Sequence, residues 1–479
     1  MYNECFRGMS STILWMGRID NMNIIYIHTH DSGRYIQPYG YPVSTPNMMR
    51  LAQESTLFRK AFCAGPTCSP SRAALLTGAC PHRNGMLGLA SRGFALNDYD
   101  MHMVRWLSKH GFRTALCGIQ HEGMNGATIG YDEVLIEPVE KNMYIKDAES
   151  FDHNSARLAA DYLRKQGEKK GSFFLSFGMI NTHRDFPIDD KSTNPDYVIP
   201  PPTLYDCAQT REDMARFMNS ARIADECLGV VLNAVRESGL EDNTIVLFTT
   251  DHGIAFPFMK CTLYDTGIGV ALMIKYPGNP LRGKVTDALV SQIDIFPTLC
   301  DLCGIEKPDW LEGESMVNIL SGDENVHGRS EVFSEVTYHA SYEPMRCVRT
   351  ERYKLIRRYD FHNCIVPSNI DNSLSKQFVL DAGILDRVNA REMLFDLYLD
   401  PMERENLVDN ADYKDIYNDL SNRLSEWMKQ TDDPLLRYGH RIPAPKGRRS
   451  TSCPVSMQNT TISNERRRMH NAFQTDGRG

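Results

Sequence analysis

Apolar residues along the first two thirds of the chain follow two different spacings. Short runs rich in β-branched and aromatic residues are typical of buried strands, and longer stretches with apolar residues three or four positions apart are typical of helices. The predicted strands cover residues 23–27, 114–118, 173–177 and 244–248, and the predicted helices cover residues 46–58, 103–110, 155–166 and 214–237. Because strands and helices alternate, we predict an α/β fold, a three-layer sandwich with a largely parallel central sheet, over residues 21–325.

The pattern changes after residue 325. Four short segments with strand-like composition, at residues 332–334, 345–350, 353–357 and 393–397, precede an amphipathic helix at 413–428. We therefore predict a small C-terminal α+β subdomain with a short antiparallel sheet over residues 326–439. We expect the leading segment, residues 1–20, to be disordered. We expect the same of residues 440–479, a basic tail with eight Lys or Arg against two acidic residues.

Composition narrows the class of protein. Hydrophobic residues make up 42% of the chain and charged residues 24%, as in an ordinary globular enzyme. The net charge of -8 argues against a nucleic-acid partner. No apolar run is long enough for a membrane span or a signal-peptide core, and the 13 cysteines are too irregularly spaced for a disulfide framework. These features predict a cytoplasmic protein with no membrane partner.

Polar residues with metal-binding side chains follow two of the predicted strands directly. His30 and Asp31 come after the first strand, and Asp251 and His252 come after the strand at 244–248. Open α/β sheets place their sites at the carboxyl ends of the strands. Oxygen ligands from separate strand ends are typical of Ca²⁺ and Mg²⁺ sites. An isolated aspartate at a strand end is more often a turn residue, so this interpretation depends on the two pairs meeting.

A nucleophilic side chain precedes a predicted helix at residues 69–78. Ser69 is a good N-cap and Pro70 suits the first helical position, so Cys68 should lie just before a helix N-terminus, which favours an anion. Arg72, one turn further on, offers a cation to the same anion. This arrangement suits a sulfate or phosphate group. The alternative is a capped helix with an inert, buried cysteine.

The sequence Cys-x-Pro-Ser-Arg at 68–72, followed by Leu-Thr-Gly at 76–78, resembles the signature of the sulfatase family, within the alkaline phosphatase superfamily. Segments 84–86, 249–257 and 342–346 are similar to the heparan N-sulfatase (N-sulfoglucosamine sulfohydrolase, sulfamidase) branch. The resemblance implies hydrolysis of sulfate esters or sulfamates of a sugar, favouring heparan-type N-sulfoglucosamine, with a bound Ca²⁺. It also implies that Cys68 becomes formylglycine, through a formylglycine-generating or anaerobic sulfatase-maturating enzyme.

The resemblance also implies roles for individual residues. Cys68 would carry the nucleophile, and Arg72 and Lys260 would neutralise the charge on the sulfate. His121 and His183 fall where the family places active-site histidines, one of which protonates the leaving group. Metal ligands and candidate sugar contacts complete the set: His30, Asp31, Asp251 and His252 for the metal, and His82, Tyr338, His339, Tyr342 and Arg346 for the sugar.

Two residues depart from the family pattern. His30 stands where a second aspartate is usual, which removes one negative charge and should weaken Ca²⁺ binding relative to Mg²⁺, Mn²⁺ or Zn²⁺. The lysine usually found two residues before the first histidine is absent, because Ile119 and Gln120 precede His121. His30 or Arg34 could substitute for that lysine. Two alternatives therefore stay open: a phosphodiesterase or phosphonate monoester hydrolase of the same superfamily, and a catalytically weak sulfatase-like binding protein.

Overall fold

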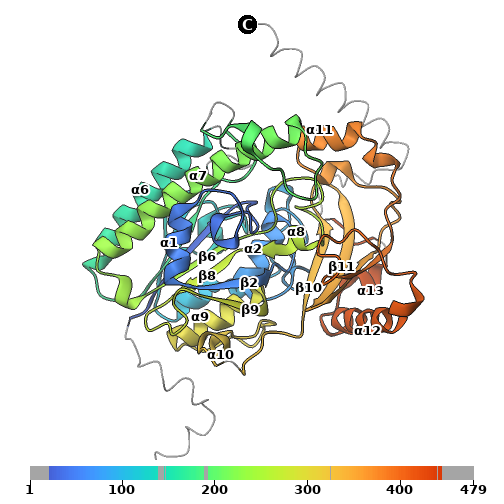
Figure 1. Ribbon diagram of the computed structural model, residues 1–479. Helices are drawn as coiled ribbons and strands as arrows, with labels where there is room; N and C mark the ends of the chain where they lie inside the picture. Colours follow the sequence, from blue (N-terminus) through green and yellow to red (C-terminus); the bar gives the residue numbers. More distant parts are fainter. Residues whose placement is uncertain are drawn as a thin grey trace, which may run out of the picture.

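The computed structural model describes residues 21–138, 145, 147–187, 192–323, 325–439 and 441–444. Figure 1 shows a large α/β layered body beside a smaller sheet that carries α12. The leading segment 1–20 and the basic tail, apart from residues 441–444, lie outside the described residues. Within the described part of the chain, no helix is long and apolar enough to cross a membrane.

The central sheet has nine strands within the described residues, in the order β4-β3-β5-β1-β6-β8-β2-β7, with β9 paired to β2. Pairs of β1 with β5 and β6, of β3 with β4 and β5, and of β2 with β9 are parallel, whereas β7 and β8 pair antiparallel with their neighbours. The predicted, largely parallel sheet is therefore confirmed. The strands are β1 (Asn23–Thr29), β2 (Thr56–Phe62), β3 (Arg113–Gly118), β4 (Glu133–Ile136), β5 (Phe173–Gly178), β6 (Thr244–Thr250), β7 (Gly269–Val270), β8 (Leu272–Lys275) and β9 (Lys284–Ser291).

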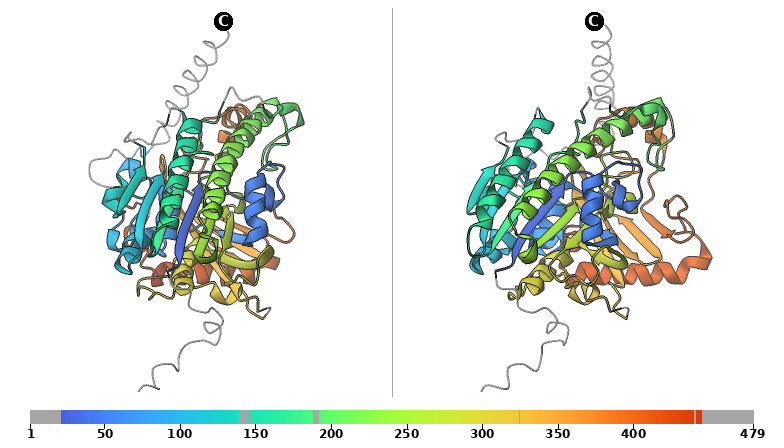
Figure 2. Two further views of the ribbon diagram at one scale, coloured as in Figure 1. Left: turned by 90° about the vertical axis from the view of Figure 1, so that its left-hand side faces the viewer. Right: turned by 60° about the vertical axis from the view of Figure 1, so that its left-hand side comes forward.

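Helices cover both faces of this sheet because successive strand residues point to opposite faces. Ile24 and Tyr26 join the cluster that contains α2 (Cys68–Thr77), α4 (Met103–Lys109) and α9 (Ile295–Cys303). Ile25 and Ile27 face the other way, toward α1 (Pro46–Glu54), α6 (Ala148–Gly167) and α7 (Ala208–Glu237). Figure 2 shows α6 and α7 side by side across that second face. The shorter helices are α3 (Pro81–Asn84), α5 (Gly126–Ile129), α8 (Asp265–Ile268) and α10 (Val317–Leu320).

A second, antiparallel sheet follows, as predicted for the C-terminal part. Its order is β10-β11-β12-β13, and α12 (Lys414–Gln430) packs Leu420 and Leu424 against β11 and β12. One hydrophobic cluster includes side chains from both sheets, so the division at residue 325 stays a prediction. The elements are β10 (Glu331–Tyr338), β11 (Tyr342–Thr350), β12 (Tyr353–Arg358), β13 (Glu392–Asp396), α11 (Leu374–Asp381) and α13 (Pro434–Tyr438).

Several predicted element boundaries are wrong. The helices predicted to begin at residues 155 and 214 begin at Ala148 and Ala208. The helix expected to reach Phe58 ends at Glu54, and β2 begins at Thr56. Phe58 pairs with Thr286 of β9, so sheet pairing overrides its helix-like spacing. The helix expected after Ser69 begins at Cys68 itself, with the extended Thr67 as its N-cap residue.

Candidate active site

The two strand-end pairs meet because β1 and β6 are adjacent and parallel. Thr29 lies opposite Thr250, so the residues after them emerge at the same carboxyl edge of the sheet. The Asp31 amide donates a hydrogen bond of 2.8 Å to Asp251 Oδ1. The sequence-based expectation that these pairs converge is therefore met in the structure.

Four side-chain atoms at this edge face one another. Asp31 Oδ1 lies 3.2 Å from His252 Nε2 and 3.9 Å from His30 Nδ1, and Asp251 Oδ2 lies 3.6 Å and 3.4 Å from the same two nitrogens. His252 Nδ1 lies 3.0 Å from the Gly253 carbonyl, so an Nδ1–H donor there leaves Nε2 as a ligand. Both ring nitrogens of the buried His30 lack a hydrogen-bond partner among the described residues. This donor set fits one divalent cation.

The thiol of Cys68 points into this cluster. Its Sγ lies 3.5 Å from His252 Nε2 and 3.9 Å from Asp31 Oδ1. Burial raises the pKa of the Cys68 thiol well above its usual range, against an opposing effect of Lys260. The unmodified side chain is therefore a neutral thiol at pH 7.

Arg72 holds the strand ends that carry this cluster. One of its Nη atoms donates to the Thr29 carbonyl at 2.9 Å and to Asp251 Oδ2 at 3.0 Å, and the other lies against His28 Nδ1. The sequence predicts that Arg72 faces the same anion as Cys68, but in the structure its contacts are with these strand ends. It fixes Asp251 in place, and Ser71 Oγ adds a hydrogen bond of 2.5 Å to the Asp251 carbonyl.

Lys260 supplies a second buried cation. Its Nζ lies 2.8 Å from Asp31 Oδ2 and 2.9 Å from Asp371 Oδ2. Burial alone would lower the pKa of Lys260, but the two carboxylates raise it well above its usual range. Burial opposes ionisation of Asp31 as well, and Lys260 and His252 hold the pKa of that carboxyl well below its usual range. The pair is therefore ionised at neutral pH.

Three histidine rings, those of His30, His121 and His183, lie close to one another in this cluster. The ring of His30 lies edge-on to His121 at 4.5 Å and to His183 at 5.2 Å between centroids. Burial, with Arg72 nearby, lowers the pKa of both His30 and His121 well below the usual value, so both rings are neutral. His121 and Asp31 adopt φ values of 78° and 38°, a left-handed backbone region that is uncommon for non-glycine residues.

Neither residue at the position of the absent lysine provides a cation. Ile119 is buried, and Gln120 Oε1 accepts hydrogen bonds from the Glu122 and Gly123 amides, at 2.7 Å and 2.9 Å. Arg34, considered above as a substitute, donates to the Ala61 carbonyl and lies over the ring of Phe62. The Arg34 guanidinium is therefore occupied by contacts outside the cluster.

The predicted sugar contacts divide into three groups. His339 lies near the cluster, where burial and the charge of Lys260 lower its pKa to about 3. Tyr338 and Tyr342 instead bind the backbone of Ile442: one hydroxyl donates to its carbonyl at 2.6 Å, and the other accepts from its amide at 3.0 Å. Their assignment to the sugar pocket gains no support from these contacts.

His82 and Arg346 lie in a separate buried network. His82 Nδ1 is 2.9 Å from Glu335 Oε1, and Arg346 is paired with Asp433 at 2.6 Å and with Glu335 at 3.0 Å. The remaining donors of Arg346 go to Thr337 Oγ1 and to backbone carbonyls. The side chain is fully buried and its donors are occupied, so we replace the sugar-contact interpretation of Arg346 with a structural one. His82, equally buried in this network, is reassigned with it.

Sequence reasoning missed three residues of the site. Asp371 forms an ion pair with Lys260. The Gln292 side chain accepts a hydrogen bond from Ser71 of α2 and donates one to the Thr250 carbonyl of β6. Glu122 is buried near Arg72; burial raises the pKa of its carboxyl to about 8, so it is largely neutral at pH 7. Asp371 and Gln292 follow no strand-end or motif pattern in the sequence, whereas Glu122 directly follows His121 and could have been considered with it.

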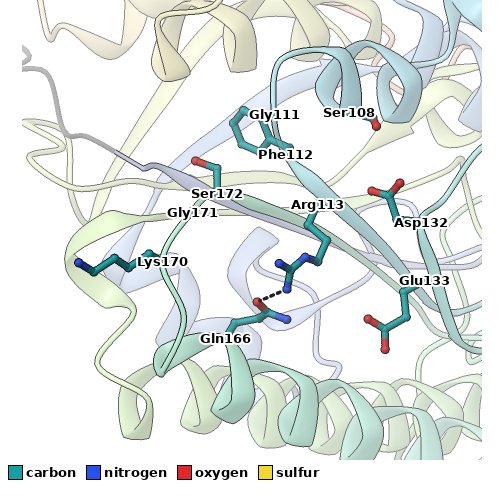
Figure 3. Close-up of a pocket in the computed structure, with 10 residues that line it drawn as sticks. All are labelled: Ser108, Gly111, Phe112, Arg113, Asp132, Glu133, Gln166, Lys170, Gly171 and Ser172. Carbon is teal, nitrogen blue, oxygen red and sulfur yellow. Dashed lines mark hydrogen bonds between the residues drawn. The ribbon is translucent and has the colours of Figure 1, made fainter.

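A cavity of about 510 Å³ lies at the opposite edge of the sheet (Figure 3). It opens where β3, β4 and β5 begin, whereas the Cys68 cluster lies where β1 and β6 end. No residue predicted for the site lines it. Its lining residues are Ser108, Gly111, Phe112, Arg113, Asp132, Glu133, Gln166, Lys170, Gly171 and Ser172.

Matches to known protein families cover residues of both sheets. The family model described as Sulfatase matches residues 22–305, and the model described as N-sulphoglucosamine sulphohydrolase, C-terminal, matches residues 251–366. Human N-sulphoglucosamine sulphohydrolase is 28% identical over 478 residues, covering 88% of this chain and 93% of the relative. An ulvan-active sulfatase of Formosa agariphila is 25% identical over 457 residues, covering 86% and 75%.

Solved structures share the fold. A 2-O GAG sulfatase superposes with a TM-score of 0.69 at 20% identity, over 89% of this chain and 95% of that one. A protein solved with its substrate D-glucosamine-2-N,6-O-disulfate superposes with a TM-score of 0.65 at 20% identity, over 86% and 98%.

Proposed function

Because the chain belongs to the sulfatase family, whose members are sulfuric ester hydrolases, we propose that it removes sulfate groups from sugars, with heparan-type N-sulfated glucosamine as the favoured substrate. The observation that carries this proposal is the placement of Cys68 at the start of α2, pointing into the cluster of His30, Asp31, Asp251 and His252. The names of the human relative and of the disulfated glucosamine complex support the choice of sugar.

The strand-end residues are the proposed cation site. Asp31, Asp251 and His252 would hold the ion, with His30 as a further ligand, and the family favours Ca²⁺. A neutral imidazole in place of a carboxylate makes the donor set less anionic and softer, which shifts preference toward Mn²⁺ or Zn²⁺. When bound, the cation would polarise the sulfate oxygens.

The charges of the cluster suit such an ion and an anionic substrate together. Among the described residues, the carboxylates of Asp31, Asp251 and Asp371 face the cations of Lys260 and Arg72. One negative charge is left over, since the nearby Glu122 is largely neutral at pH 7. A divalent cation would reverse this balance to one positive charge, which matches the single negative charge of a sulfate monoester.

The remaining roles follow from position. Cys68, once converted to formylglycine by a maturation enzyme of the host, would supply the attacking hydroxyl. Lys260 would bind a sulfate oxygen, and Arg72 would keep Asp251 oriented. His121 and His183, both next to His30, are the candidates for delivering a proton to the leaving oxygen or nitrogen; the His121 ring, neutral without substrate, would first have to gain one beside the bound anion.

The test is a sulfate-release screen on protein co-expressed with a maturation enzyme. Substrates are glucosamine carrying N-, 6-O- or 2-O-sulfate, an aryl sulfate and an aryl phosphate, with Cys68→Ala as the matched blank. Mass spectrometry of the Cys68 peptide establishes conversion to formylglycine. We expect release above the blank, fastest from the N-sulfated sugar. Equal release by both proteins on every sulfated substrate would refute the proposal, and turnover of the phosphate alone would favour the phosphodiesterase alternative.

A further inference from the structure

Lys260 is held between carboxylates from distant parts of the chain. Asp31, at 2.8 Å, belongs to the strand-end cluster. Asp371, at 2.9 Å, comes from the segment between the 3₁₀ turn Pro367–Asn369 and α11. Asp371 lies beyond the residues that either family model matches. Two parts of the fold therefore share one ammonium group.

The segment that carries Asp371 is anchored on both sides. Before it, the Asn369 side chain accepts a hydrogen bond of 2.8 Å from the Ser341 amide and donates one of 2.7 Å to Glu343 Oε2. After it, the Ser373 side chain caps α11. The Asp371 carboxylate is therefore set by the surrounding structure rather than by the ion pair alone.

Asp371 lies on the outer side of the cluster. Its side chain is 24% exposed, against 3% for Lys260 and none for Asp31. Burial would raise the pKa of Asp371, but Lys260 and His339 lower it to about 2, so the carboxylate carries its charge at neutral pH. Lys260 thus has an inner counter-ion and an outer one.

Asp31, the inner counter-ion of Lys260, is also a proposed ligand of the cation. If Asp31 binds the cation of the proposed function, on which this inference rests, the charge of Lys260 at 2.8 Å opposes that binding. The Asp371 carboxylate compensates the charge of Lys260. It also holds Lys260 at the outer side of the cluster when Asp31 binds the cation. We infer that Asp371 is a positioning residue, which keeps Lys260 beside the sulfate-binding site and reduces its competition with the cation for Asp31.

The first test is calorimetric titration of the full chain with Mn²⁺ and Ca²⁺, which needs neither turnover nor formylglycine. Asp371→Asn should bind both ions roughly tenfold more weakly, because Lys260 then depends on Asp31 alone. Asp371→Glu should recover most of this loss, and Lys260→Met should bind more tightly than the wild type. Asp386→Asn, an exposed acid just beyond α11, is the matched control and should bind like the wild type.

Kinetics on the matured enzyme then separate a positioning role from a merely structural one. Asp371→Asn should lower kcat/KM for the sulfated sugar, and the double variant with Lys260→Met should be no worse than Lys260→Met alone. Losses that multiply in the double variant, or unchanged cation affinity in a folded Asp371→Asn protein, would overturn the inference while leaving the proposed function intact. Failure of the wild type to bind either ion, or binding that survives Asp251→Asn, would overturn both.

Discussion

Replacing His30 by aspartate would restore the second strand-end carboxylate that the sulfatase family usually has. The His30 imidazole is neutral, because burial lowers its pKa well below the usual value, so His30→Asp adds a full negative charge. We expect lower stability without a cation and tighter binding of Ca²⁺. Both effects follow from the same set of distances.

The separations of the ligand atoms give the size of the effect. A negative charge at the position of His30 Nδ1 would lie 3.4 Å from Asp251 Oδ2 and 3.9 Å from Asp31 Oδ1. At an effective dielectric constant of about 20, unit charges at these separations repel by about 5 and about 4 kcal/mol. Because the aspartate side chain is shorter and the site relaxes, we expect a net loss of about 2 kcal/mol in unfolding free energy without added cation. The same charge should raise Ca²⁺ affinity by about tenfold or more, about 1.4 kcal/mol.

Thermal unfolding with and without Ca²⁺ measures the first effect, and calorimetric titration with Ca²⁺, Mn²⁺ and Zn²⁺ measures the second. The exposed His327→Asp is the control for an added charge elsewhere. We expect a lower Tm in chelator, recovery of the Tm in Ca²⁺, and a shift of selectivity toward Ca²⁺. A variant that is destabilised in chelator yet gains neither Ca²⁺ affinity nor Ca²⁺ selectivity would refute the assignment of residue 30 as a ligand.

Further predictions concern the nucleophile and the separate network of Arg346. Cys68→Ala should abolish sulfate release, measured by ion chromatography, while changing Tm little, because a single small side chain is lost. Turnover equal to that of the wild type would contradict the role of Cys68. Arg346→Leu removes the guanidinium partner of Glu335 and Asp433 and should cost about 3–5 kcal/mol in chemical denaturation, with kcat/KM of the folded fraction nearly unchanged. A large rise in KM at unchanged stability would instead restore its sugar-contact role. Burial raises the pKa of Glu335, but Arg346 and His82 lower it to about 2, against 4.5 for an unperturbed glutamate. The ionised glutamate therefore contributes about 3 kcal/mol to stability above pH 4.5, and this contribution is lost as the pH falls through 2. Glu335→Gln should remove this pH dependence from a Tm series between pH 2 and 6.

The sheet and the convergence of the strand-end side chains could be predicted because their signals are local. The runs at 23–27 and 244–248 form strands with nearly continuous burial, and the polar residues follow each strand immediately. Parallel pairing of neighbouring strands then brings Asp31 and Asp251 together without further information. The residues around Cys68 that are typical of a helix start predicted the first residue of α2 to within one position.

Other features depend on contacts between distant segments and left no local signal. Phe58 fits the spacing of the preceding helix, and pairing with β8 and β9 is what makes its segment a strand. An aspartate in an irregular segment is ordinarily a turn residue, so Asp371 could not be connected with Lys260, 111 positions earlier. Arg346 stands in a segment similar to heparan N-sulfatases, but the buried acids that occupy it come from β10 and from the N-cap of α13.

Anomalous diffraction from crystals equilibrated with Mn²⁺ tests the central claim most directly, because it locates the cation relative to the side chain at position 68. We expect one strong peak among Asp31, Asp251 and His252, at about 2.0–2.6 Å from ligand atoms of each and next to residue 68. A peak bound elsewhere, with these side chains still paired to one another and to Lys260, would contradict it.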